Sequence, residues 1–382
     1  MIPTWKIRRE LSRLVNQIIG LPSSLISLPK RLREPTQRAA YERDFDRLTQ
    51  RDRGKVPFGN KPAIYLIYQP EGVVKSSLAT LDWLIAHGYS PIVVSNSTLC
   101  QTDRCSILER SALLLQRPNF GYDFGGYKDG IRLIIRHGIT PERVIIMNDS
   151  VWMPMVPDLM DRLEKRTDVD ILGLLEDEKI NHGRDGGQPS GLKHIESYFY
   201  MINAKAWQSA AFQSFWSAYQ LTDFKPDTIK LGEINFSRRM LQAGLQTGAL
   251  TSRALFLERI SEQDDQFIAT SLKYASYGDN DLRREGNKLR ALALDTLGWR
   301  EKVLNHIHRC VNRKRFNTAF CYASDQIFGT LFMKKNREMV FSEMRRNYLQ
   351  ATEDGTIPPP PDVILTEISD LVKKQYPDFI SK

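Results

Sequence analysis

Residues 117–150 decide the fold: they begin Arg117-Pro-Asn-Phe-Gly-Tyr-Asp-Phe-Gly-Gly-Tyr-Lys-Asp-Gly130 and end Val144-Ile-Ile-Met-Asn-Asp-Ser150. A loop rich in glycine and aromatic residues comes first, and a helical pattern follows it. An apolar strand pattern then ends in the polar triplet Asn148-Asp149-Ser150. Open α/β sheets bind their ligands at the carboxyl ends of the strands. The stretch therefore predicts a ligand site at the end of a buried strand.

Strand and helix patterns alternate on both sides of this stretch. Short apolar runs predict buried strands at residues 63–68, 91–95, 143–147 and 169–174. Helical spacing of apolar residues predicts helices at residues 76–87, 104–115, 127–137 and 159–165. The alternation predicts an α/β fold in which a mostly parallel sheet is flanked by helices on both faces.

The pattern changes after residue 175. The polar, glycine-rich segment 176–192 predicts a long loop of the kind that covers substrates. A strand is expected at 194–203, and helices are expected at 204–219 and 232–243. The helical spacing of four large aromatic residues predicts that they pack in the core: Trp207, Phe212, Phe215 and Trp216.

Composition divides the chain into three parts. Residues 1–60 form a basic, helix-prone arm, and residues 61–258 carry the α/β pattern. Residues 259–382 form a C-terminal helical region with a proline-rich spacer at 356–361.

The net charge of +9 comes from two flanking segments. Residues 1–55 hold 13 Lys/Arg against 6 Asp/Glu, and residues 281–346 hold 15 against 7, so the remainder is mildly acidic. Such flanks suit an anionic membrane surface, nucleic acid or ordinary solvated helix faces. The sequence contains no recognised nucleic-acid-binding module and no run of apolar residues long enough to span a membrane. Four cysteines without metal-ligand spacing fit free thiols in a reducing cytoplasm.

Two readings stay open for each polar residue of the opening stretch. Asp149 is able to ligate a divalent cation, whereas an Asx turn at the strand end would need no ligand. Asp123 is able to bind sugar hydroxyls or to cap the following helix. Gly121 and its neighbouring glycines permit close approach of the backbone to a ligand. Tyr122 and Tyr127 either stack on a ligand or pack internally.

Three motifs, taken in order, resemble the rhamnan synthesis F family of bacterial rhamnosyltransferase-like enzymes of polysaccharide assembly. They are residues 119–130, residues 144–150, and His194-Ile-Glu-Ser-Tyr-Phe-Tyr200. The resemblance covers residues 60–260, and it extends to neither the arm nor the C-terminal helices. It implies a GT-A-like glycosyltransferase domain, whose related enzymes place an Asp-x-Asp metal and donor motif where this chain has its triplet. The triplet has one acid, which leaves the metal requirement open.

The resemblance also implies roles for individual residues. Asp149 is the expected metal ligand, for Mg²⁺ or Mn²⁺, and Glu233 is the expected general base, against the alternative of an ordinary acidic residue in the first turn of a helix. His194 and Glu196 are expected to contact the acceptor, although His194 also fits a satisfied surface histidine. The expected donor-binding residues are Tyr68, Asn119, Gly121, Asp123, Tyr127, Asn148 and Ser150.

The expected function is that of an inverting glycosyltransferase. The donor would be a dTDP-rhamnose-like nucleotide sugar, and the acceptor a lipid-linked polysaccharide or O-antigen of the bacterial cell surface. The basic flanks would hold a cytoplasmic enzyme at the anionic inner face of the cell membrane, and no nucleic-acid partner is expected. The alternative is a non-catalytic membrane-surface binding protein with a degenerate glycosyltransferase fold.

Overall fold

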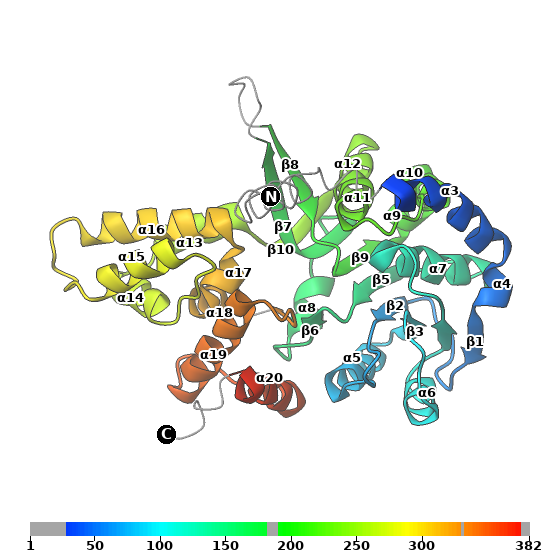
Figure 1. The fold of residues 1–382 in the computed structure, drawn as a ribbon, viewed down its shortest axis with the longest axis horizontal. Helices are drawn as coiled ribbons and strands as arrows, with labels where there is room; N and C mark the ends of the chain where they lie inside the picture. The colour runs from blue at the N-terminus through cyan, green and yellow to red at the C-terminus, as the bar shows by residue number, and fades with distance from the viewer. Residues whose placement is uncertain (1–27, 182–189, 330–331, 376–382) are drawn as a thin grey trace, which may run out of the picture.

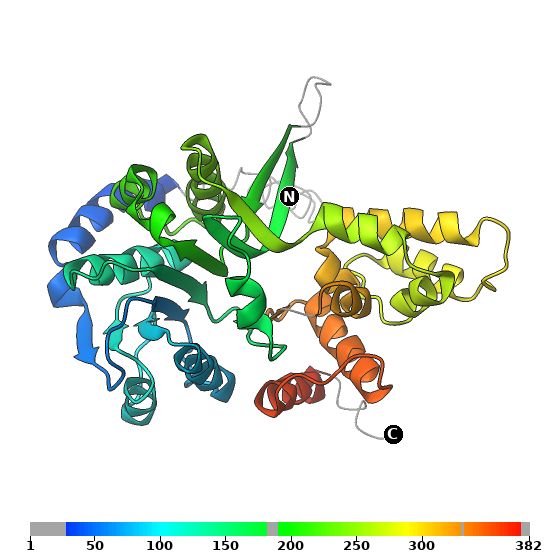
Figure 2. The same cartoon turned by 180° about the vertical axis from the view of Figure 1, so that it is seen from behind.

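The computed structural model describes residues 28–181, 190–329 and 332–375. A large sheet carries helices on both faces, and the C-terminal helices form a group at one side of it (Figure 1). The view from behind shows the same separation of the sheet from the C-terminal helices (Figure 2). Within the described residues, no helix combines the length and the apolar character needed to cross a bilayer.

Nine strands form the central sheet. They are β1 (Gln50–Arg53), β2 (Pro62–Ile67), β3 (Ser90–Ser95), β4 (Leu113–Gln116), β5 (Arg143–Asn148), β7 (Ile171–Asn181), β8 (Ser190–Ile195), β9 (Phe199–Asn203) and β10 (Thr247–Ser252). Their order is β1-β4-β3-β2-β5-β9-β7-β10, with β8 paired to β7. Strands β4, β3, β2 and β5 are parallel, β7 and β10 are parallel, and β9 runs antiparallel between β5 and β7. This mostly parallel sheet confirms the predicted fold class.

Alternate residues of the central strands face two separate cores, as the strand period of two requires. On β2, Tyr65 and Ile67 pack with helices of one face, whereas Ile64 and Leu66 pack with helices of the other. The helices around the sheet are α3 (Leu28–Arg43), α4 (Phe45–Leu48), α5 (Lys75–Ala86), α6 (Gln101–Leu108), α7 (Tyr122–Arg136), α8 (Leu159–Glu164), α9 (Ala204–Gln208), α10 (Ala210–Ala218), α11 (Lys225–Asp227), the π-helix η1 (Thr228–Ile234) and α12 (Asn235–Gln242). The four aromatic residues expected in the core at 207–216 are all buried, which confirms that prediction.

The C-terminal region is helical, as predicted, but it returns to the sheet. Its helices are α13 (Arg253–Ser261), α14 (Asp265–Lys273), α15 (Asn280–Arg290), α16 (Trp299–Arg313), α17 (Phe316–Ala319), α18 (Cys321–Phe328), α19 (Met339–Glu353) and α20 (Asp362–Gln375). Between α18 and α19, the short strand β11 (Met333–Lys334) pairs antiparallel with β6 (Val151–Trp152). Trp152 is buried in a third core with α19 and α20, so the segment after the triplet is anchored to the C-terminal helices.

Several predicted elements differ from the structure. The expected strand 194–203 is divided by the turn between β8 and β9. The predicted helix 104–115 is wrong in its second half, where the apolar run 113–115 forms β4 between β1 and β3. The predicted loop 176–192 is wrong at both ends, because β7 and β8 pair there as a hairpin; its middle, 182–189 with His182, lies outside the described residues. The predicted helix 232–243 belongs to a longer helical segment that begins at Lys225, where Pro226 occupies the first turn.

Helix α7 also begins five residues before its predicted start at Tyr127. Gly125 and Gly126, which were expected in a loop, therefore lie inside the helix. A Cβ atom on Gly126 would overlap the side chain of Leu66 on β2. The missing side chain lets α7 pack directly on the sheet, which offsets the low helix propensity of glycine. Gly126, and Gly130 against Ile64 in the same way, therefore serve helix–sheet packing.

The described part of the basic arm packs against the α/β domain. Strand β1 extends the sheet, and Tyr41 on α3 donates a hydrogen bond to Asp129 on α7 at 2.6 Å. Arg117 Nε lies 2.7 Å from the same carboxylate, and neither side chain of this ion pair is more than 1% exposed. Asp129 therefore joins the arm, the start of the opening stretch and α7.

We expect Asp129→Ala to lower the free energy of unfolding by about 3 kcal/mol or more, because it leaves the Arg117 guanidinium buried without its counterion. Urea unfolding measures the change. The matched control is Asp82→Ala, which removes the carboxylate of an exposed pair with Arg110 and should cost about 1 kcal/mol or less. Equal losses in the two variants would contradict the structural role of the buried pair.

Candidate functional site

The candidate site lies where the chain changes direction within the sheet. From β2 the chain crosses through α5 to β3 on one side, whereas β5 joins β2 on the other side after α7. The carboxyl ends of β2 and β5 are adjacent, with Leu66 paired to Asn148. In open α/β sheets this switch point leaves a crevice in which ligands bind.

A cavity of about 710 Å³ lies at this point. Its walls come from the ends of β2 and β5, the start of α7, the β8–β9 turn, the π-helix η1 and the C-terminal region. The cavity is lined by seven of the residues expected in the site: Tyr68, Asp123, Asn148, Asp149, Ser150, Glu196 and Glu233.

The triplet Asn148–Ser150 forms the Asx turn that was one of its two readings. Asn148 Oδ1 accepts a hydrogen bond from the Ser150 backbone N–H at 3.1 Å and another from the Ser150 hydroxyl. The turn and the site are compatible, because the same three residues line the cavity. The turn fixes the strand end and presents the next polar atoms to the cavity.

Asp149 is held in place by the end of β2. Its Oδ2 accepts hydrogen bonds from the Tyr68 backbone N–H at 3.0 Å and from Gln69 Nε2 at 2.8 Å. Burial raises the pKa of Asp149, although Lys335 and these hydrogen bonds oppose the rise. Tyr68 itself is 54% exposed at the edge of the cavity, so its ring is available to a ligand.

Asp123 stands in the first turn of α7 and faces the same cavity. Its Oδ2 accepts a hydrogen bond from Asn148 Nδ2 at 3.0 Å. The pKa of Asp123 is raised to about 6. Burial is the largest cause, and the negative charges of Asp149 and Glu233 contribute the rest. Such a perturbed carboxyl group in a cavity is typical of a functional site.

Glu233 lies in the π-helix η1, a kind of turn found often at functional sites. It is 8% exposed, and its Oε2 accepts a hydrogen bond from the Ser197 backbone N–H at 2.8 Å. His194 Nε2 lies 3.3 Å from its Oε1. Burial would raise the pKa of Glu233, but these two partners outweigh burial and lower it. Glu233 is thus an ionised carboxylate in the middle of a helical segment, not a first-turn residue.

The remaining expected site residues do not line the cavity. His194 is 6% exposed, so the surface-histidine alternative is wrong. His194 contacts Glu233, which lines the cavity. Tyr127 is fully buried and donates a hydrogen bond to the Ser197 carbonyl oxygen at 2.7 Å. Gly121 begins α7 with φ of 84°, and its N–H donates to Asp223 at 2.8 Å. Asn119 is exposed and accepts a hydrogen bond from Asn96. Their placement supports the walls of the cavity.

The opposite wall carries basic residues that the sequence had not indicated. Lys314, Arg315, Lys334 and Lys335 all line the cavity from the C-terminal region. They belong to the basic segment 281–346, whose charge in the sequence was compatible with binding to an anionic membrane surface. No local motif marked these four residues, because the fold alone brings them to the strand ends.

Glu196 joins the two walls. Its side chain is 3% exposed; one carboxylate oxygen is bonded to Arg315 Nη2, and the other accepts a hydrogen bond from Lys334 Nζ at 3.1 Å. Burial lowers the pKa of Lys334 to about 8, and the charge of Arg315 also lowers it. The ion pairs occupy both oxygens of Glu196, which was expected to contact the acceptor.

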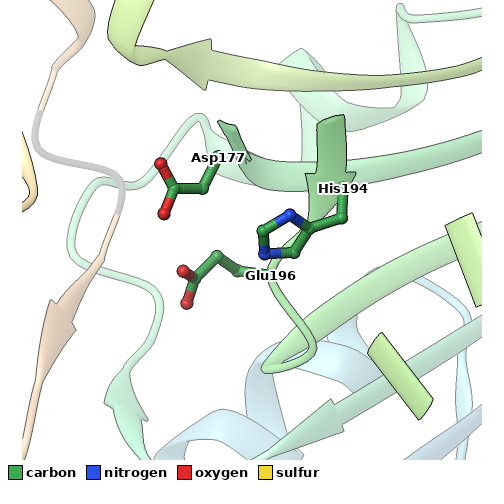
Figure 3. A group of neighbouring side chains, drawn as sticks. All are labelled: Asp177, His194 and Glu196. Carbon is green, nitrogen blue, oxygen red and sulfur yellow. The ribbon is translucent and has the colours of Figure 1, made fainter. Parts of the chain in front are cut away.

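One group of side chains has the spacing of a metal site. Ligand atoms of Asp177, His194 and Glu196 lie within 4.8 Å of one another (Figure 3). Each already has a charged partner: Arg253 lies 2.6 Å from Asp177, Glu233 is beside His194, and Glu196 carries its two cations. A divalent ion would be repelled by these three cationic side chains, so the group does not fit a resident metal.

Asp149, the expected metal ligand, also offers a poor donor set. One of its oxygens already accepts two N–H hydrogen bonds. Mg²⁺ requires near-octahedral oxygen coordination, and proteins usually supply it with one or two carboxylates together with substrate phosphates. Lys335 lies close enough to Asp149 for each side chain to favour the charged form of the other. A positive charge is therefore already present where a metal would be expected to act.

The raised pKa of Asp123 predicts a pH-dependent effect on stability. The folded value of about 6 lies above the ordinary value of 3.8, so the native state binds this proton more tightly than the unfolded chain. The resulting stabilisation is present below about pH 4 and is lost as the pH rises through about 6. Asp123→Asn should therefore raise the free energy of unfolding by about 1–3 kcal/mol at about pH 7.5 and leave it unchanged at about pH 4.

Urea unfolding of both proteins at the two pH values measures this difference. Asp161→Asn on the exposed side of α8 is the control and should show no such pH-dependent gain. A gain for Asp123→Asn of the same size at both pH values would contradict the assigned ionisation.

Comparison with known proteins agrees with this geometry. Residues 91–268, which contain most of the strand-end wall, match the family model described as "Rhamnan synthesis protein F". A relative from Sinorhizobium fredii (strain NBRC 101917 / NGR234), "Uncharacterized protein y4gN", is 32% identical over 277 residues. That alignment covers 72% of this chain and 68% of the relative. The matched model ends before the basic wall begins.

Proposed function

Because this chain belongs to the rhamnan synthesis protein F family, we propose that it is an inverting glycosyltransferase that uses a nucleotide-sugar donor. Family membership suggests a glycosyltransferase-like role in rhamnan synthesis. The observation that carries the finer proposal is the cavity at the sheet's switch point, which is lined both by ionised Glu233 and by the triplet Asn148–Ser150. The proposed donor is dTDP-rhamnose-like, and the proposed acceptor is a lipid-linked glycan.

The donor would lie over the carboxyl ends of β2 and β5. Tyr68, exposed at the end of β2, offers a ring on which a nucleobase can stack, and Asn148 and Ser150 offer polar atoms to the ribose or sugar. Asp123, on the start of α7, offers a carboxyl group to sugar hydroxyls. These assignments follow the usual placement of ligands at a topological switch point.

Inversion requires one base and a stabilised leaving group. The acceptor hydroxyl oxygen bonds to the anomeric carbon as the bond from that carbon to the donor phosphate breaks. The electron pair of the broken bond goes to the phosphate oxygen, and the hydroxyl proton goes to Glu233. His194 and the Ser197 N–H hold the Glu233 carboxylate in position for this transfer.

We expect Glu233→Gln to lower transfer by about 10²–10⁴-fold, because general base catalysis contributes that much, while donor binding stays within about threefold. Release of nucleoside diphosphate from dTDP-rhamnose, in the presence of lipid-linked glycan extracted from bacterial membranes, measures the rate. The control is Glu258→Gln, which changes an exposed residue of α13 and should leave the rate unchanged.

Asp123→Asn distinguishes the second carboxyl group of the cavity. If this variant loses transfer and Glu233→Gln keeps it, Asp123 is the base and the assignment of Glu233 is wrong. If the wild-type protein binds and turns over no nucleotide sugar, the protein is instead the non-catalytic binding protein.

We also propose that the N-terminal residues attach the enzyme to an anionic membrane surface. Residues 1–27 hold four Lys/Arg and one Asp/Glu. Each Lys or Arg near an anionic surface contributes about 1 kcal/mol. Removal of residues 2–27 should therefore lower flotation with phosphatidylglycerol-rich vesicles by at least about tenfold. Flotation with phosphatidylcholine vesicles is the control, and unchanged flotation with the anionic vesicles would contradict the proposal.

A further inference from the structure

We propose that Lys335, together with Lys334 and Arg315, binds and neutralises the diphosphate of the donor, in place of a divalent cation. The inference rests on the proposed function, since it assumes a nucleotide sugar in the cavity. It assigns a binding role to the C-terminal region, which the family match leaves uncovered.

The backbone fixes Lys335 beside the triplet. Strand β6 starts at Val151, directly after Ser150, and pairs with β11, which ends at Lys334. The Lys335 backbone N–H then donates a hydrogen bond to the Ser150 carbonyl oxygen at 2.8 Å. A phosphate bound over the triplet would therefore lie within reach of the Lys335 side chain.

The Lys335 ammonium is directed by neighbours on other elements. Its Nζ donates a hydrogen bond to Ser76 Oγ at 3.0 Å and lies 5.6 Å from the centre of the Trp152 ring. Ser76 and Trp152 in turn donate to the carboxylate of Glu367 on α20, at 2.6 and 3.0 Å. An ammonium group has three N–H donors, so the Ser76 contact leaves donors for phosphate oxygens.

A second cationic pair lies across the same cavity. Arg315 and Lys334 share the carboxylate of Glu196. Arg315 also lies 3.8 Å from Asp177, which is paired with Arg253, so these three cations and two carboxylates together keep a net positive charge. The Arg315 side chain is 36% exposed and lines the cavity, so its guanidinium group is accessible to a phosphate oxygen.

The charges of the cavity differ between its two sides. Asp123, Asp149 and Glu233 come from the α/β domain together with one lysine, Lys225, whereas Lys334 and Lys335 come from the opposite wall together with one carboxylate, Glu338. An anionic diphosphate is attracted to the basic wall, and the sugar then lies toward the carboxylates. This orientation places the anomeric carbon on the side of Glu233 and the leaving phosphate on the side of the lysines.

Calorimetric binding of inorganic pyrophosphate and of dTDP, in buffer with EDTA or with Mg²⁺, tests the inference. The wild-type protein should bind both probes in EDTA, with affinities within about threefold of those in Mg²⁺. Lys335→Ala should weaken both by about 10- to 100-fold, as loss of a charged hydrogen bond implies, whereas Lys335→Arg should recover most of the affinity. The matched control is Lys302→Ala, which alters an exposed lysine of α16 and should bind like the wild type.

Asp149→Asn separates the two ways of neutralising the diphosphate. It removes a negative charge, so unchanged or tighter binding in EDTA supports the lysine assignment. The inference is overturned if binding requires Mg²⁺ or Mn²⁺, is lost in Asp149→Asn and is unaffected in a folded Lys335→Ala. That result leaves the glycosyltransferase proposal standing. A wild-type protein that binds neither probe in either buffer overturns both. Thermal unfolding of each variant shows that it is folded.

Discussion

The ion pairs of Glu196 with Arg315 and Lys334 connect the α/β domain to the C-terminal region across the cavity. The carboxylate sits at the turn between β8 and β9, while Arg315 and Lys334 come from chain segments 119 and 138 residues later. Burying a carboxylate costs several kcal/mol unless charged partners compensate it, so this contact is stable only when the C-terminal region is folded against the sheet. The β6–β11 pairing adds a backbone connection at the same edge.

This arrangement explains why one cavity contains charges of both signs. The sheet supplies carboxylates where parallel strands end, and the C-terminal helices supply ammonium and guanidinium groups opposite them. The proposed nucleotide-sugar donor would need both walls, because its diphosphate needs positive charge and the transfer needs a proton acceptor. The basic segment 281–346 thereby has a role inside the fold, and the membrane proposal rests on the N-terminal residues.

The sequence predicted the part of the site that depends on local pattern. Alternating strands and helices predicted the mostly parallel sheet, and the polar triplet indicated a site at the end of β5 because open α/β sheets bind ligands there. The family resemblance, rather than local pattern, indicated Glu196 and Glu233, and both line one cavity with Asp149. Local pattern failed where tertiary contacts decide: Gly126 of α7 packs on Leu66 of the sheet, and the apolar run 113–115 is a strand because β1 and β3 flank it. Lys334 and Lys335 had no local signal, since only the β6–β11 pairing brings them to the triplet.

We propose that the cavity between the strand ends and the basic wall binds a nucleotide sugar through its diphosphate. A crystal structure with dTDP bound tests it most directly. We expect phosphate oxygens within about 3 Å of Lys335 Nζ, the usual hydrogen-bond distance, with the nucleobase beside Tyr68. A nucleotide bound elsewhere on the protein, or an empty cavity at saturating dTDP, would contradict it.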